Sequence, residues 1–121
     1  MKILIVDDSK AMRLLVKRIL RQVGVDTDDT IEAADGQEGV EQVMAHQPEL
    51  VISDWNMPNK NGIEFLREIR AKQYTGKFGF VTTETSREMR EIAINAGAQF
   101  MIGKPFTPES FQSTIVPVIE A

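Results

Sequence analysis

The chain has 121 residues, of which 42% are hydrophobic and 26% charged, and its formal net charge is −4 at pH 7. This length and composition favour one compact globular domain over residues 1–121. The negative charge argues against nucleic acid as the main partner, because binding to phosphates needs a basic surface. The absence of cysteine excludes disulfides and zinc–thiolate sites. No apolar run is long enough for a signal peptide or a membrane span, so we expect a cytoplasmic protein.

Apolar, β-prone segments alternate five times with amphipathic segments of helical length. The predicted strands cover residues 1–6, 30–33, 50–53, 78–83 and 99–103. The predicted helices begin at five polar or proline positions: after Ser9, Asp35, Asn61 and Thr85, and at Pro108. Glutamates follow three of these caps at the capping-box spacing, as Glu38, Glu64 and Glu88. Strands joined through helices predict an α/β fold with a parallel five-stranded sheet, doubly wound and covered on both faces.

Two residues carry specific local expectations. Pro117 lies inside the last helical pattern and removes a backbone donor, so it should kink the helix or end it early. Trp55 follows the third strand directly, and we expect it to be partly buried at a loop.

Polar side chains end four of the predicted strands. They are Asp7 and Asp8 after the first strand, Asp54 after the third, Thr82 in the fourth and Lys104 after the fifth. Ligands of open α/β sheets bind at the carboxyl ends of the strands, so these groups should meet at one edge. Three carboxylates held together repel one another unless a cation or a raised pKa offsets the repulsion. Oxygen ligands without histidine or cysteine favour Mg²⁺, with Mn²⁺ as a second possibility.

A metal beside a lysine and a hydroxyl suits a phosphoryl group, because the cations neutralise its charge and the hydroxyl donates a directed hydrogen bond. Asp54 is the remaining candidate nucleophile, and its attack would form an acyl phosphate. An FMN site would need an uncharged loop after the first strand, where Asp7 and Asp8 would repel its phosphate. The acidic segment 25–29 lacks the glycine and closing glutamate of an EF-hand, and a solvated loop is favoured there.

Five short motifs, taken together, identify a family. They are Ile5-Val6-Asp7-Asp8-Ser9, Asp54-Trp55-Asn56-Met57-Pro58, Asn61-Gly62, Val81-Thr82 and Lys104-Pro105-Phe106. With these motifs in this order, the chain resembles the receiver domains of two-component response regulators, and most closely the single-domain, CheY-like chemotaxis regulators. The resemblance implies the flavodoxin-like (βα)5 fold and a stand-alone signalling function.

The resemblance also implies a role for each site residue. Asp54 would be the phosphoacceptor for a histidine kinase. The Mg²⁺ ligands would be Asp8 directly, Asp7 through water, Asp54, and the backbone carbonyl of Asn56. Thr82 would be the switch hydroxyl and Lys104 would contact the phosphoryl group, with the Lys104–Pro105 peptide bond cis.

Asn56 and Glu84 occupy the positions that tune how fast water attacks the acyl phosphate, so the resemblance implies rapid self-dephosphorylation. Chemotaxis relatives carry an aromatic switch residue three positions before the lysine, where this chain has Met101. Methionine can repack beside Thr82 but presents no phenol to a partner, which puts binding to the flagellar motor switch protein in doubt. Phosphorylation would reshape the face made by the 86–96 helix, the last strand and the final helix.

Three other functions fit parts of this sequence. The chain could serve as a phosphate sink or relay intermediate that does not bind the motor. An aspartate-nucleophile phosphohydrolase is less favoured, because short loops leave no substrate cap. A non-phosphorylated scaffold would be expected to lack Asp54, Thr82 or Lys104, and all three are present. We therefore expect a monomeric signalling protein rather than an enzyme.

Overall fold

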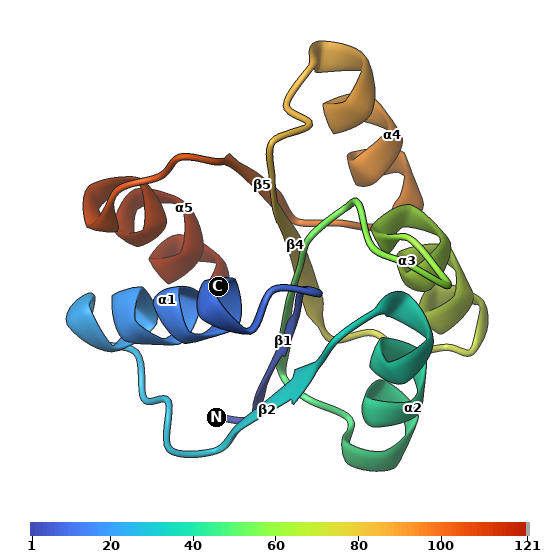
Figure 1. The fold of residues 1–121 in the computed structure, drawn as a ribbon, viewed down its shortest axis with the longest axis horizontal. Coiled ribbons are helices and arrows are strands. Elements are labelled where there is room, and N and C mark those ends of the chain that lie inside the picture. Colours follow the sequence, from blue (N-terminus) through green and yellow to red (C-terminus); the bar gives the residue numbers. More distant parts are fainter. Residues whose placement is uncertain (121) are drawn as a thin grey trace.

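The computed structural model describes residues 1–120, and all five predicted strands and five predicted helices are present (Figure 1). In chain order the elements are β1 (Ile3–Val6), α1 (Lys10–Gln22), β2 (Thr30–Ala33), α2 (Gly36–His46), β3 (Leu50–Ser53), α3 (Gly62–Ala71), β4 (Lys77–Thr82), α4 (Arg87–Ala96), β5 (Phe100–Gly103) and α5 (Pro108–Glu120). All strand pairs are parallel, and the strand order is β2-β1-β3-β4-β5. The predicted doubly wound, flavodoxin-like α/β fold is confirmed.

The sheet forms the middle layer of three. Figure 1 shows α1 and α5 against one of its faces and α2, α3 and α4 against the other. Because both faces are covered, side chains of the inner strands are buried whichever way they point, and β1 and β3 are buried at every position. The edge strand β2 is less covered, and its Glu32 is exposed. None of the helices in residues 1–120 is long and apolar enough to cross a membrane.

Two apolar clusters lie on opposite faces of the sheet, as the alternation of strand side chains requires. On the α2–α3–α4 side, strand residues such as Phe78, Phe80 and Met101 pack with helix residues. On the α1–α5 side, Phe100 packs with Phe111 and its neighbours. Met101 and Phe100 therefore face opposite sides, as predicted.

Helix caps decide where most of these helices begin. Ser9, Asp35 and Asn61 each accept a hydrogen bond from the amide three residues on, and at Asn61 the reciprocal bond from Glu64 completes a capping box. The prediction of Thr85 as the cap of α4 was wrong by one residue. Ser86 is the cap, its hydroxyl accepting from the amide of Met89 at 3.1 Å.

Of the two effects predicted for Pro117, a kink or an early end of the last helix, the early end is wrong, because α5 continues to Glu120. The missing proline donor affects only the last turns, whereas Phe111 and Ile115 are fully buried and hold the helix on the sheet. The ammonium of Lys77 in β4 also donates to the backbone carbonyl of Val118, which ties the end of α5 to the sheet. Tertiary contacts therefore outweigh the local effect of proline here.

Candidate metal centre at the carboxyl edge of the sheet

The register of the parallel strands brings the predicted site residues to one edge. Val6 at the end of β1 is paired with Ser53 at the end of β3, so Asp7 and Asp54 leave neighbouring strands at the same level. The amide of Asp54 donates to the carbonyl of Val6 at 2.9 Å, which continues the ladder one step past the strands. The amide of Lys104 likewise donates to the carbonyl of Thr82 at 2.9 Å.

Three carboxylates meet at this edge. Asp7, Asp8 and Asp54 each offer an oxygen, and these oxygens lie within 4.8 Å of one another. Asp7 is buried, Asp54 is half-buried and Asp8 is exposed, so the cluster opens to solvent on the Asp8 side. Among residues 1–120 this is the one cluster of three such side chains with metal-ligand spacing. An all-oxygen donor set fits Mg²⁺ or Mn²⁺.

Lys104 bridges two of the carboxylates. Its ammonium lies 3.1 Å from Oδ2 of Asp54 and 3.2 Å from Oδ2 of Asp7. The other oxygen of each carboxylate accepts a backbone amide, from Trp55 at 2.7 Å for Asp54 and from Ser9 at 2.8 Å for Asp7. Each of these two carboxylates is thus held at both oxygens, which fixes its orientation before any ligand arrives.

Burial and neighbouring charges shift the pKa values of Asp7 and Lys104. Burial raises the pKa of Asp7, and the charge of Asp54 adds to that rise, although the Ser9 amide and Lys104 act against it. Burial acting alone would lower the pKa of Lys104, but its hydrogen bonds and charge interactions with Asp54 and Asp7 outweigh burial and raise it. The site therefore keeps its ammonium charged and holds more negative charge than one lysine neutralises, which favours a divalent cation.

Thr82, Asn56 and Glu84 lie around this centre. Thr82 is fully buried, and its hydroxyl oxygen accepts a hydrogen bond from the amide of Glu84 at 3.2 Å. Nδ2 of Asn56 lies 3.4 Å from Oε1 of Glu84, so two exposed side chains from the loops after β3 and β4 meet.

Met101 is buried on the same face of the sheet as Phe80, with which it is paired in register. Its cluster also includes Met89 and Ile92 of α4. Met101 therefore connects β5 with the inner side of α4, and a change in the packing of Met101 would alter the contacts of that helix.

The Lys104–Pro105 peptide bond is cis, as the resemblance implied.

The expectation of partial burial for Trp55 was wrong. The side chain is only 6% exposed, and its ring centroid lies 4.8 Å from that of Phe80. The loop that follows it is drawn inward because the Gly62 amide donates to the Trp55 carbonyl at 2.7 Å. A Cβ atom at Gly62 would lie 2.4 Å from the carbonyl oxygen of Asp54, so only glycine allows this approach.

Sequence reasoning missed one contact that holds the loop after β3. Asn59 has a left-handed φ of 65°, and its amide donates to Oδ2 of Asp35 at 2.7 Å. Oδ1 of the same carboxylate caps α2, and the next amide, of Gly36, donates to the Lys60 carbonyl at 3.0 Å. An asparagine in a turn was a visible signal, but its partner 24 residues away was not.

The comparisons with known proteins agree with this geometry. Residues 3–116 match the family model described as the response regulator receiver domain. The chain belongs to this family. It is 37% identical over 122 residues to the chemotaxis protein CheY homolog of Campylobacter jejuni, covering 98% of this chain and 92% of that protein. It is 39% identical over 123 residues to the probable chemotaxis protein CheY of Rhizobium etli, covering 99% and 93%.

A solved structure supports the same assignment. The chemotaxis response regulator CheY4 of Vibrio cholerae superposes with a TM-score of 0.84 at 34% identity, covering 97% of each chain. The protein is thus a CheY-like receiver, a class of signalling proteins. Receivers bind Mg²⁺ through an acidic pocket, and the cluster of Asp7, Asp8 and Asp54 provides such a pocket here.

Proposed function

We propose that this receiver is a stand-alone, cytoplasmic and monomeric phosphorylation switch in which Asp54 accepts a phosphoryl group from a histidine kinase in a Mg²⁺-dependent reaction. The observation that carries the proposal is the pairing of Asp54 with Lys104 inside a cluster of three carboxylates. A half-buried lysine and a metal-ligand set around one carboxylate are what phosphoryl transfer to that carboxylate requires.

In the transfer, an Asp54 oxygen attacks phosphorus, the bond to the donor nitrogen breaks, and the donor histidine leaves with the electron pair. Bound Mg²⁺ would neutralise charge on the carboxylates and on the phosphoryl oxygens. Its ligands would be Asp8, Asp7 through water, Asp54 and the backbone carbonyl of Asn56. The Lys104 ammonium, now 3.1 Å from Asp54, stays with the transferred group and supplies the second positive charge.

The switch begins at Thr82. Its hydroxyl oxygen now accepts from the Glu84 amide, and to donate to a phosphoryl oxygen it must turn away from the 83–84 backbone. The space that it leaves lies on the face of the sheet where Met101 is buried, so Met101 repacks and the surface of α4, β5 and α5 changes. A partner protein that prefers the changed surface shifts the equilibrium only by its difference in affinity between the two states.

In this proposal the phosphorylated state of Asp54 is short-lived. Asn56 follows the acceptor by two residues and lies 3.4 Å from Glu84, and these two side chains set the access and orientation of the water that hydrolyses the acyl phosphate. The partner is a component of chemotaxis or motility signalling. The flagellar motor switch protein is one candidate partner. The alternative role is a phosphate sink or relay, and Met101 in place of an aromatic residue favours this alternative.

The test is phosphoryl labelling by a small acyl-phosphate donor and by a histidine kinase, followed by peptide mapping. We expect wild-type protein to be labelled at Asp54 only with Mg²⁺ present and to lose the label within minutes. Asp54→Asn should abolish labelling, whereas Asp28→Asn, an exposed acid elsewhere, should leave it unchanged. Undiminished labelling of Asp54→Asn, or a label that persists for many hours, would contradict the acceptor or the self-dephosphorylation, respectively. A pull-down with beryllofluoride-treated protein, comparing motor switch protein with kinase, separates the two downstream roles.

A further inference from the structure

The loop between β3 and α3 carries a metal ligand that belongs to the backbone. In the proposed function the carbonyl of Asn56 binds Mg²⁺, and the direction of a carbonyl depends on the conformation of the chain around it. Mg²⁺ requires nearly ideal octahedral geometry. A loop that became ordered only on binding would lower the affinity, because the cost of ordering is subtracted from the binding free energy. The contacts that hold residues 55–61 therefore bear on the metal site.

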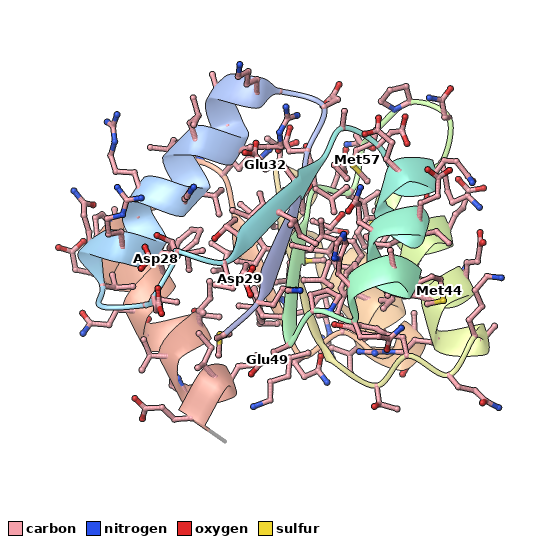
Figure 2. All side chains as sticks on the ribbon, turned by 90° about the horizontal axis from the view of Figure 1, so that it is seen from below. Asp28, Asp29, Glu32, Met44, Glu49 and Met57 are labelled. Atoms are coloured by element: carbon pink, nitrogen blue, oxygen red, sulfur yellow. The ribbon has the colours of Figure 1, made fainter. Side chains whose placement is uncertain are left out.

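Some of the contacts that hold this loop are local. The Trp55 amide donates to Oδ1 of Asp54 at 2.7 Å, and the Gly62 amide donates to the Trp55 carbonyl at 2.7 Å. Met57, labelled in Figure 2 close to the start of α2, is partly buried and packs against the apolar cluster on that side of the sheet. Because methionine packs in several ways, this contact draws the loop inward without fixing its conformation.

Two further hydrogen bonds join the loop to the start of α2. The side-chain amide of Asn59 donates to Oδ2 of Asp35 at 2.7 Å, and the Gly36 amide donates to the Lys60 carbonyl at 3.0 Å. A Cβ atom at Gly36 would lie 2.4 Å from that carbonyl oxygen, so the helix end and the loop are in close contact. The α2 tether consists of these four residues. It holds the loop at the third and fourth residues after Asn56.

Asp35 does more than cap α2. Its Oδ1 accepts from the Glu38 amide at 2.8 Å, which is the capping bond, whereas Oδ2 accepts from Asn59. A serine hydroxyl is sufficient for capping, as Ser9 and Ser86 show at the starts of α1 and α4. Asp35 is only 8% exposed, so water competes weakly for its second oxygen. The carboxylate thus supplies one oxygen to the helix and one to the loop.

Asn59 is likewise more than a turn residue. Its φ of 65° lies in the left-handed region, which glycine adopts more readily than any residue with a side chain. Glycine would make this turn without the hydrogen bond to Asp35. Asparagine makes the same turn and adds a donor that connects the loop to another element of the fold.

We propose that Asp35 and Asn59 are positioning residues that set the affinity of the site for Mg²⁺. They act by holding the loop that carries the Asn56 carbonyl, and this inference rests on the proposed role of that carbonyl. Neither residue belongs to the cluster of three carboxylates, and both oxygens of Asp35 already accept hydrogen bonds within the chain. Loss of the contact would leave the three carboxylates in place and lower the affinity through the loop.

The experiment titrates Mg²⁺ into the protein at constant ionic strength and follows Trp55 fluorescence. Asp35→Ser keeps an oxygen that can cap α2 but offers no second oxygen to Asn59, and Asn59→Gly keeps the left-handed turn but removes the donor. The double variant lacks both groups. Tyr74→Phe is the matched control, because it removes the hydrogen bond from the Tyr74 hydroxyl to the Pro48 carbonyl, at the opposite edge of the sheet.

Two further measurements separate positioning from stability. Urea unfolding without Mg²⁺ gives the free energy of unfolding of each variant, and the Mg²⁺ titrations are made where every variant is folded. Amide hydrogen exchange in the metal-free protein reports the local opening of residues 55–61.

We expect Asp35→Ser and Asn59→Gly each to raise the Mg²⁺ dissociation constant about three- to tenfold and to speed amide exchange in residues 55–61. The double variant should bind Mg²⁺ no more weakly than the weaker of the two single variants, because both substitutions remove the same contact. Tyr74→Phe should be less stable than wild type and bind Mg²⁺ equally well.

Three results would overturn this inference alone. They are wild-type Mg²⁺ affinity in both single variants, additive losses in the double variant, and an equal loss in Tyr74→Phe, which would mean that affinity follows overall stability. If wild-type protein itself gives no response to Mg²⁺, the metal site of the proposed function is contradicted and this inference falls with it. The two failures are therefore distinguishable.

Discussion

Removal of the Lys104 ammonium should expose the repulsion that it now offsets. In Lys104→Met the aliphatic stem is kept and the charge is lost. Lys104, Asp7 and Asp54 are at most 15% exposed at their side chains, so solvent screens their interactions little. Asp7 and Asp54 then remain as neighbouring carboxylates without the ammonium between them.

The structure sets the size of the effect. Carboxylate oxygens within 4.8 Å of one another repel by about 3.5 kcal/mol at an effective dielectric constant of about 20. Loss of one partner from a buried ion pair costs a similar amount, about 3–5 kcal/mol. We therefore expect Lys104→Met to lose about 3 kcal/mol of unfolding free energy without Mg²⁺. In an Asp54→Asn background the same substitution should cost about 1 kcal/mol, because the repulsion is already gone.

Urea unfolding followed by Trp55 fluorescence and by circular dichroism measures these free energies, with equal m values as the check on two-state behaviour. Added Mg²⁺ should stabilise Lys104→Met more than wild type, because the ammonium and the cation compete for the same oxygens. A loss below about 1 kcal/mol in the single variant, or the same loss in both backgrounds, would refute the reasoning.

Three further predictions concern Tyr74, Asp35 and Gly62. Burial raises the pKa of Tyr74, the sole tyrosine, to about 12, so its ultraviolet titration should have its midpoint there. Because unfolded tyrosine ionises near pH 10, Tyr74 contributes stability below about pH 10 that is lost as the pH rises through 12, and a folded-state midpoint near 10 would be contrary evidence. The amide of the first turn of α2 lowers the pKa of Asp35, so its contribution is present above about pH 4 and is lost on acidification. Asp35→Ala should lower the free energy of unfolding by about 1–2 kcal/mol and Asn59→Ala by about 1 kcal/mol, measured by chemical unfolding. If the stabilities of Asp35→Asn and wild type depend on acidification in the same way, this account is contradicted. Gly62→Ala should destabilise the protein by about 1–3 kcal/mol and reduce labelling, because its Cβ would lie 2.4 Å from the Asp54 carbonyl oxygen; wild-type labelling and stability would contradict that close approach.

The fold followed from the sequence because its signals are local and repeated. Apolar strands, capped helices and closing glycines each occur within a few residues, and Gly97 ends α4 in the left-handed conformation as its type predicts. The errors arose where tertiary contacts decide the outcome. Pro117 stays helical because the rest of α5 is packed, and Trp55 is buried because Phe80 lies beneath the loop.

The composition of the site was predictable for a different reason. Once the strands are parallel, residues that end them must share an edge, so Asp7, Asp54 and Lys104 could be placed together. The division of the Lys104 ammonium between two carboxylates could not be predicted, because it depends on side-chain conformations. Neither could the Asp35–Asn59 contact, which joins two loops through a hydrogen bond with no sequence pattern of its own.

A magnesium titration tests the central claim most directly. Trp55 donates its amide to Asp54, so its indole should report cation binding among the carboxylates. We expect Mg²⁺ to change Trp55 fluorescence in a saturable way and to raise the unfolding free energy of wild-type protein, and both effects to be lost in Asp8→Asn. If the emission and the stability of wild-type protein are unchanged by Mg²⁺, the carboxylates do not form a metal site, and the proposed phosphoryl transfer to Asp54 fails with it.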